Sequence, residues 1–157
     1  FHTGDAGYLK DSHLYLTERI KDLFKTSNGK YISPQALETK LAIDRYIDQI
    51  AVIADERKFV SALIVPVYGF VKDYAKEKGI AYSNMDELLQ HPKIQALFRA
   101  RIDTLQQQFA HYEQAKRFTL LPEPFSMERG ELTNTLKLKR SVVAKNYKEL
   151  IDKMYEE

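Results

Sequence analysis

The sequence lacks cysteine altogether, and it is poor in the residues that define fibrous or disordered chains. Of its 157 residues, 6 are glycine and 5 are proline, which excludes a collagen-like or low-complexity chain. Without cysteine, the chain can form neither a disulfide framework nor a thiolate zinc site. These absences leave an ordinary globular domain, for which ~100–200 residues is the usual size.

An excess of charge of one sign is also missing, because 24 lysine and arginine side chains face 22 aspartate and glutamate side chains. The net charge of +2 is too small to indicate a nucleic-acid partner or an electrostatic membrane site. No apolar run approaches the ~18 residues that a membrane-spanning helix needs. The hydrophobic residues, 44% of the chain, are instead spaced periodically, as expected for the core of a folded domain.

This spacing predicts an α+β fold, in which a small mixed β-sheet is packed with helices and preceded by a β-hairpin. Alternating patterns predict strands over 8–10, 14–17, 23–25, 30–32, 49–54, 59–66 and 117–121. The strands 49–54 and 59–66 should form an antiparallel pair. Apolar residues three and four apart predict helices over 33–44, 70–79, 85–90, 92–112 and 142–154.

Turn and cap residues support these boundaries. Asp11-Ser12-His13 predicts the turn of the first hairpin, and Ser27-Asn28-Gly29 predicts a second, because Asn and Gly tolerate a positive φ. Ser33 and Pro34 are a preferred N-cap and first helical residue. Asn84 begins a pattern like a capping box.

Few residues of the chain carry a recognisable catalytic pattern. The four histidines show no metal-ligand spacing, and H-E-x-x-H, nucleophile-elbow and Walker motifs are absent, so we predict no metal site. One stretch of interest contains Asp5, Arg19, Asp22 and a tight turn at 27–30. Carboxylates, guanidinium groups and the N–H groups of tight turns can bind ribose hydroxyls and phosphates. Another is the alternating Leu/Lys run that contains Lys137, although a single lysine is usually solvated.

Together, these stretches resemble motifs of the adenylate-forming superfamily of acyl-CoA synthetases, acyl-adenylating enzymes and luciferases. More narrowly, they resemble the carboxyl-terminal part of a bacterial long-chain fatty-acid–CoA ligase. His2-Thr3-Gly4-Asp5 followed by Gly7-Tyr8 is similar to the motif whose aspartate grips the ATP ribose. Residues 18–34 resemble the segment that joins the two domains, and residues 131–140 resemble the last core motif, which carries the catalytic lysine.

The resemblance implies a two-step reaction in which a small domain takes a different pose for each step. ATP and a fatty acid give an acyl-adenylate and pyrophosphate, with Mg²⁺, and coenzyme A then displaces AMP to give a thioester. A lysine between the carboxylate and the α-phosphate would offset the charge that builds up in the first transition state. The roles implied are catalytic for Lys137, nucleotide-binding for Asp5 and Arg19, hinge for Asp22, and a CoA-facing turn for Ser27, Asn28, Gly29 and Lys30.

The resemblance also implies that the chain, which begins at Phe1 without an initiator methionine, is a fragment. Residues 1–21 would be the tail end of a large N-terminal domain, and residues 22–157 the small C-terminal domain that works with it. Most of the Mg²⁺ and ATP contacts would then lie upstream, so we expect the isolated fragment to be inactive. We also expect a cytoplasmic enzyme, with peripheral contact to the inner membrane as an alternative. In the isolated fragment we expect either fraying of residues 1–20 or pairing with another copy through an edge strand.

Two other functions stay open at this point. One is the C-terminal domain of an enzyme that adenylates an aryl or amino acid and loads a carrier protein. The other is a non-catalytic interaction module.

Several positions depart from the usual family pattern, among them Asn134, which stands where the long-chain branch often has proline. Asn28 and His13 stand where glycine is usual, and Leu136 stands where many members have glycine just before the lysine. Because asparagine tolerates a left-handed backbone, we expect the 27–30 turn to survive, although the change bears on the CoA half-reaction. At His13 we expect a looser turn.

Overall fold

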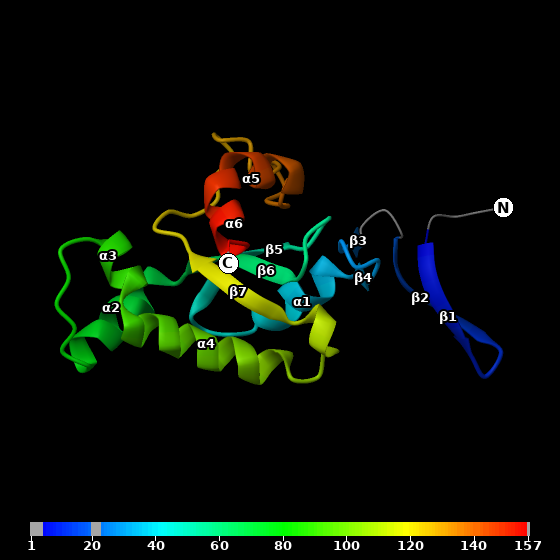
Figure 1. The fold of residues 1–157 in the computed structure, drawn as a ribbon, viewed down its shortest axis with the longest axis horizontal. Helices are drawn as coiled ribbons and strands as arrows, with labels where there is room; N and C mark the ends of the chain where they lie inside the picture. Colours follow the sequence, from blue (N-terminus) through cyan, green and yellow to red (C-terminus); the bar gives the residue numbers. More distant parts are fainter. Residues whose placement is uncertain (1–4, 20–22, 157) are drawn as a thin grey trace.

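A three-stranded mixed sheet organises the chain in the computed structural model, which describes residues 5–19 and 23–156 (Figure 1). For residues 5–10 and 15–19 the description is limited to the backbone. The sheet has the order β5-β6-β7, with strands β5 (Ile47–Ile53), β6 (Val60–Pro66) and β7 (Ala115–Leu120). Strands β5 and β6 are antiparallel, whereas β6 and β7 are parallel, which confirms the predicted mixed sheet and its antiparallel pair.

Helices cover both faces of this sheet. They are α1 (Pro34–Leu41), α2 (Tyr68–Glu77), α3 (Met85–Gln90), α4 (Pro92–Gln106), α5 (Arg140–Asn146) and α6 (Lys148–Met154). Helices α2, α3 and α4 form the crossover that a parallel pair such as β6 and β7 requires. In Figure 1, α4 runs below the sheet and α5 with α6 lies above it.

Alternating side chains of the strands divide the core into two clusters. Val52, Ala62 and Ile64 pack in the cluster that includes residues of α1 and α4. Their neighbours Ala51 and Leu63 pack in the cluster under α5 and α6. Successive side chains of a strand point to opposite faces, so the central strand β6 is buried along its whole length.

Local signals placed the starts of α1 and α3 correctly. The Ser33 hydroxyl accepts a hydrogen bond from the Ala36 backbone (3.2 Å), with Pro34 next in the chain. The Asn84 side chain accepts from the Glu87 backbone (2.9 Å), which confirms the predicted cap.

Two helix predictions were wrong in their extent. Helix α4 ends at Gln106 rather than near residue 112, because the buried Gln106 amide bonds both to the Ala115 N–H (2.8 Å) and to the Ala115 carbonyl (3.1 Å). A short 3-10 helix, His111–Glu113, follows before β7. The single helix expected over 142–154 is instead the pair α5 and α6, which meet at Tyr147, whose ring packs edge-on against Phe125 (5.8 Å between centroids).

Two small hairpins precede the first helix. Strands β1 (Asp5–Lys10) and β2 (His13–Arg19) pair with each other, as do β3 (Phe24–Lys25) and β4 (Tyr31–Ile32), so both predicted hairpins are confirmed. In Figure 1 the β1–β2 hairpin, in blue, projects from the side of the domain on which β3 and β4 lie.

The turn of the first hairpin differs from its expected form. Asp11 and Ser12 both adopt a positive φ (50° and 66°), as in a two-residue turn of the kind that suits the twist of a hairpin. His13 already pairs with Lys10 in the ladder. The looser turn expected at His13 is therefore wrong, because the unusual backbone angles fall on the two residues before it.

Candidate functional site

The Lys137 backbone is held in a short hairpin, residues 131–139, which we call the lysine hairpin. The Lys139 N–H donates to the Glu131 carbonyl (2.8 Å), and the Thr133 N–H donates to the Lys137 carbonyl (2.8 Å). The Lys137 N–H donates in turn to the Thr133 hydroxyl (3.0 Å). The Lys137 side chain is exposed, and its ammonium group forms no hydrogen bond or ion pair with the part of the chain that the structure describes. Hydrogen bonds thus hold the Lys137 backbone in place, while its ammonium group is unpaired with the described residues.

Leu136, at the tip of the lysine hairpin, has a left-handed backbone. Its φ is 62°, its N–H donates to the Thr133 carbonyl (2.8 Å), and its side chain is 67% exposed. A left-handed residue with a Cβ costs about 1–2 kcal/mol, a cost that glycine avoids. The preference for glycine at this position therefore has a backbone reason, and the exposed leucine gains little packing energy in return.

A buried carboxylate supports the base of the lysine hairpin. Glu131 is fully buried, and its carboxylate accepts hydrogen bonds from the Ser126 N–H (3.1 Å), the Arg129 guanidinium (3.0 Å) and the Asn146 amide (3.2 Å). Burial by itself raises the pKa of Glu131, but the donors of Asn146, Arg129 and Ser126 outweigh it and hold the pKa below its ordinary value. Glu131 is therefore an anion at neutral pH. Sequence reasoning missed this role, because the burial of Glu131 and its contact with Asn146 of α5 arise only when the hairpin packs against that helix.

The 27–30 turn connects β3 to β4 and has a different kind of support. The Thr26 N–H donates to the Lys30 carbonyl (2.9 Å), and the Gly29 N–H donates to the Thr26 carbonyl (2.9 Å). Gly29 adopts a φ of 80°, whereas Asn28 does not adopt a positive φ. The turn survives with asparagine at position 28, as expected, and the residue that needs glycine is Gly29.

The 27–30 turn rests on the turn between β5 and β6. The Ser27 N–H donates to the Arg57 carbonyl (3.0 Å), and the Glu56 N–H donates to the Lys25 carbonyl (2.8 Å). The Arg57 guanidinium is bound to the Asp152 carboxylate on α6 (2.8 Å). The residue that accepts from Ser27 through its backbone is thus tied to the last helix through its side chain.

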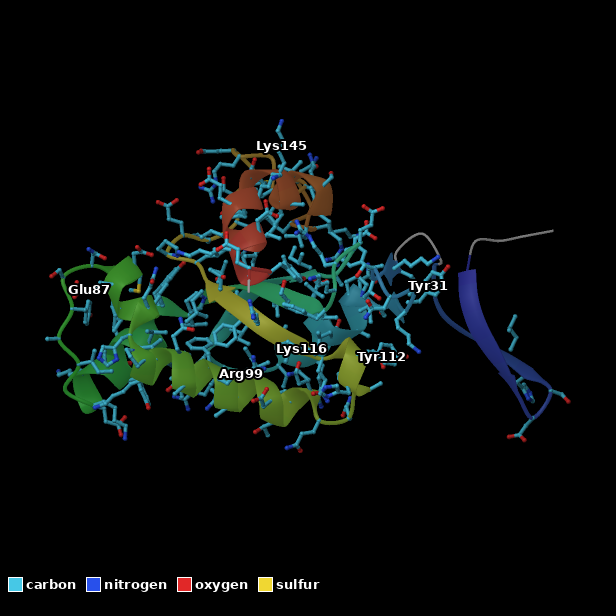
Figure 2. All side chains as sticks on the ribbon, in the orientation of Figure 1. Tyr31, Glu87, Arg99, Tyr112, Lys116 and Lys145 are labelled. Carbon is cyan, nitrogen blue, oxygen red and sulfur yellow. The ribbon has the colours of Figure 1, made fainter. Side chains whose placement is uncertain are left out.

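Exposed lysines and tyrosines lie beside the 27–30 turn. The Lys30 ammonium lies 5.3 Å from the centre of the Tyr112 ring, and the Lys25 ammonium lies 5.8 Å from that of Tyr31. Figure 2 shows Tyr31 and Tyr112 at the same end of the domain. Cations held over aromatic rings keep their charge available to an anionic ligand.

The other predicted site residues are separated from the lysine hairpin along the chain. Asp5 and Arg19 lie directly opposite each other in the β1–β2 ladder, which brings the two proposed nucleotide contacts together. Asp22 lies outside the described residues. No hydrogen bond or ion pair between described side chains joins the 27–30 turn to the lysine hairpin.

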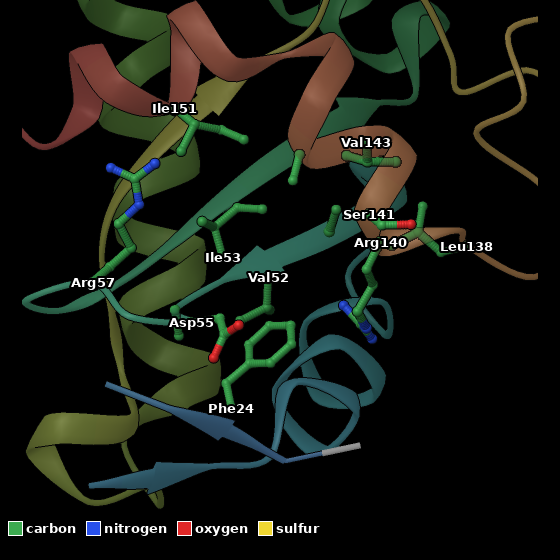
Figure 3. A pocket seen from close by; sticks show the side chains of 13 residues that line it. Phe24, Val52, Ile53, Asp55, Arg57, Leu138, Arg140, Ser141, Val143 and Ile151 are labelled. Carbon is green, nitrogen blue, oxygen red and sulfur yellow. The ribbon is translucent and has the colours of Figure 1, made fainter. Parts of the chain in front are cut away.

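A cavity of about 350 Å³ lies between β3, β5 and the helices α5 and α6 (Figure 3). Phe24 and Leu138 line it, and the Arg140 guanidinium lies 5.5 Å from the centre of the Phe24 ring. Arg140 also forms an ion pair with Glu38 of α1, whose carboxylate accepts from the Val52 N–H (3.0 Å). The chain that follows Lys137 is thus tied to α1 and β3. Neither Lys137 nor the 27–30 turn lines this cavity, and both are exposed.

A metal-binding cluster and a membrane-spanning helix are both absent from the described residues. No group of three or more histidine and carboxylate side chains there has the arrangement of a metal site. None of the helices there has both the length and the apolar character required to cross a membrane.

The fold of the domain has counterparts among solved structures, and a family model shows the family to which the chain belongs. It matches the adenylation domain of a carboxylate reductase from Mycobacterium chelonae with a TM-score of 0.77 and 23% identity, over 99% of this chain and 23% of that chain. The family model described as the AMP-binding enzyme C-terminal domain matches residues 21–157. The chain therefore belongs to the C-terminal domain family of AMP-binding, adenylate-forming enzymes, as its motifs indicate.

Among curated proteins, the chain is similar over almost its whole length to long-chain acyl-CoA synthetases and ligases. The chain is 36% identical over 160 residues to the peroxisomal long chain acyl-CoA synthetase 7 of Arabidopsis thaliana, covering 99% of this chain and 23% of the relative. It is 32% identical over 157 residues to the long-chain-fatty-acid–CoA ligase FadD15 of Mycobacterium tuberculosis, covering 99% of this chain and 26% of the relative. The chain thus spans about a quarter of the length of these relatives.

Proposed function

We propose that the chain is the C-terminal part of a long-chain fatty-acid–CoA ligase. The observation that carries this proposal is its similarity over 99% of its length to proteins named as long-chain acyl-CoA synthetases and ligases. The reaction joins a fatty acid to coenzyme A through an acyl-adenylate, with ATP and Mg²⁺. The large N-terminal domain supplies most of the ATP, Mg²⁺ and acyl contacts, and this domain supplies the catalytic lysine. The fragment alone is inactive for that reason.

Lys137 acts in the adenylation half-reaction. Its ammonium is exposed and unpaired with the described residues, and its backbone is held by hydrogen bonds on both sides. A cation in this state can enter the site of another domain and bridge the fatty-acid carboxylate and the α-phosphate. It draws two anions together and offsets the charge of the transition state.

The other predicted site residues bind the nucleotide, form the hinge or face coenzyme A. Asp5 and Arg19, which face each other in the β1–β2 ladder, bind the ATP ribose and phosphate. The hinge lies at Asp22, between the tail of the large domain (1–21) and the small domain (22–157). After rotation, the 27–30 turn faces the pantetheine arm of coenzyme A. The enzyme works in the cytoplasm, and peripheral contact with the inner membrane is the alternative.

Exchange of pyrophosphate into ATP in the presence of palmitate measures the adenylation half-reaction by itself. In the longer enzyme with its own upstream sequence, Lys137→Ala should lower this exchange by about 10²–10³-fold, the usual effect of removing a charge-stabilising donor. Lys139→Ala is the matched control, because Lys139 is also exposed and lies two residues away. Unchanged exchange in Lys137→Ala would overturn the assigned role.

A panel of acids tests the substrate class separately. Palmitate should support the exchange, whereas benzoate and amino acids should not. Exchange with an aryl or amino acid alone would replace the proposed substrate while leaving the role of Lys137 intact. Micromolar binding of ATP by the isolated chain would favour a nucleotide-sensing module instead.

A further inference from the structure

The two loops that serve the proposed half-reactions are supported by different charged groups. We infer that Glu131 is a positioning residue for adenylation and that Arg57, held by Asp152, is a positioning residue for thioester formation. This inference rests on the proposed function, because it concerns how the same domain presents the lysine hairpin and the 27–30 turn. Each half of the inference depends on its own set of contacts.

The contacts of Glu131 fix the lysine hairpin at its base. Its own carbonyl accepts from the Lys139 N–H (2.8 Å) and its N–H donates to the Ser126 carbonyl (3.0 Å), so its backbone joins the hairpin to the preceding turn. Its carboxylate binds Arg129 of that turn and Asn146 of α5. Charged hydrogen bonds in a buried site are short and directional, so they define one position for the hairpin.

The position of Lys137 depends on the base of the hairpin. Lys137 lies only two residues before Lys139, whose N–H donates to the Glu131 carbonyl. Replacing the carboxylate with an amide exchanges one of its two acceptor oxygens for an NH2 group, which cannot accept from Arg129 or Asn146. One of these charged hydrogen bonds is then lost, and the base of the hairpin can shift. A shift of about 1 Å at a reacting group costs up to about 10²-fold in rate. The position of the ammonium, rather than its charge, is what Glu131 controls.

The contacts of Arg57 fix the 27–30 turn in a comparable way. Its carbonyl accepts from the Ser27 N–H (3.0 Å), while its guanidinium binds Asp152 (2.8 Å) and lies 4.9 Å from the centre of the Tyr155 ring. The Tyr155 hydroxyl in turn donates to the Phe59 carbonyl (2.7 Å). Arg57 therefore connects the 27–30 turn to the C-terminal helix α6.

The two anchors share no residue among the described contacts. The Glu131 anchor uses the 126–130 turn and the end of α5, whereas the Arg57 anchor uses the β5–β6 turn and α6. Weakening one anchor should therefore leave the other loop in place. This separation makes the inference testable with two variants and two assays.

The test compares both half-reactions in each variant of the longer enzyme. Palmitate-dependent ATP–pyrophosphate exchange measures adenylation, and transfer from supplied palmitoyl-adenylate to coenzyme A measures thioester formation. Glu131→Gln keeps the shape of the side chain but removes its charge, and it should lower kcat of exchange about tenfold with KM for ATP unchanged. Its rate of transfer should stay at the wild-type value.

Asp152→Asn should show the opposite pattern. It removes the charge that holds Arg57, so the transfer rate should fall about threefold to fivefold while exchange is unchanged, a smaller effect because this pair is partly exposed. Glu128→Gln and Glu149→Gln are matched controls, since both carboxylates are exposed and lie near Glu131 and Asp152 in the chain. Neither control should change either rate.

The ratio of the two rates separates positioning from misfolding. A misfolded fraction lowers both rates equally and leaves their ratio unchanged, so equal losses in Glu131→Gln would overturn the inference. Asn146→Ala, which removes one partner of Glu131, should lower exchange in the same direction but less. If Lys137→Ala abolishes exchange while Glu131→Gln does not reduce it, the inference is wrong and the proposed function stands. If Lys137→Ala has no effect, the proposed function itself is wrong.

Discussion

The lysine hairpin and the 27–30 turn are both tight hairpins that present an exposed lysine, yet they are stabilised differently. The 27–30 turn has glycine at its left-handed position, Gly29, and rests on backbone hydrogen bonds and a partly exposed ion pair. The lysine hairpin has leucine at its left-handed position, Leu136, and rests on the buried carboxylate of Glu131. The same loop geometry can thus depend on a glycine in one place and on a buried charge in another.

The largest expected effect on stability lies at the buried charge. Glu131→Ala removes the acceptor of three donors, and leaving such groups unsatisfied should lower the free energy of unfolding by about 2–3 kcal/mol. Asp152→Ala breaks a partly exposed pair and should lower it by less. Urea unfolding of both variants measures the difference. An equal loss in the two would remove the contrast between the anchors.

Acidification should affect the lysine hairpin through the same carboxylate. The folded-state pKa of Glu131 lies below its ordinary value of 4.5, so its stabilising contribution is complete above about pH 4.5 and is lost as the pH falls through the lowered pKa. Unfolding free energies measured from pH 7 to pH 3 should therefore fall more steeply for the wild type than for Glu131→Gln. Parallel curves for the two proteins would show that Glu131 does not cause the loss of stability at low pH.

At Gly29, an added side chain should destabilise the 27–30 turn. A Cβ there meets no atom within 4 Å, so the cost of Gly29→Ala comes from the backbone angle alone. A left-handed alanine should lower the free energy of unfolding by about 1 kcal/mol. Asn28→Ala is the control, because that position has no positive φ. Thermal unfolding should show a lower midpoint for Gly29→Ala alone.

The smallest expected effect has the opposite sign. Leu136→Gly relieves a left-handed residue whose side chain is mostly exposed, so it should raise the free energy of unfolding by about 0.5 kcal/mol. Thr135→Gly is the control and should lower it, because the hydrogen bond between the hydroxyls of Thr133 and Thr135 (3.0 Å) is lost. Urea unfolding with the two variants side by side checks the sign. A destabilised Leu136→Gly would mean that Leu136 makes a packing contribution.

Local signals explain why much of the fold could be predicted. The caps at Ser33 and Asn84 and the alternating β5 and β6 strands involve neighbours in the chain, so their pattern is visible in the sequence. The extent of α4 could not be predicted in this way. Its end depends on Gln106 bonding to Ala115 across the fold, a contact that no local pattern encodes.

Residue type and spacing were enough to predict the α+β class, both hairpins and the order of the three motifs. Only the tertiary structure showed that the left-handed backbone angles fall at Gly29 and Leu136 and not at Asn28 or His13. Only the folded chain buried the carboxylate of Glu131 and brought Asn146 of α5 to it. Spacing indicates which side chains share an element or a turn, whereas burial and a donor from another element arise only when the elements pack.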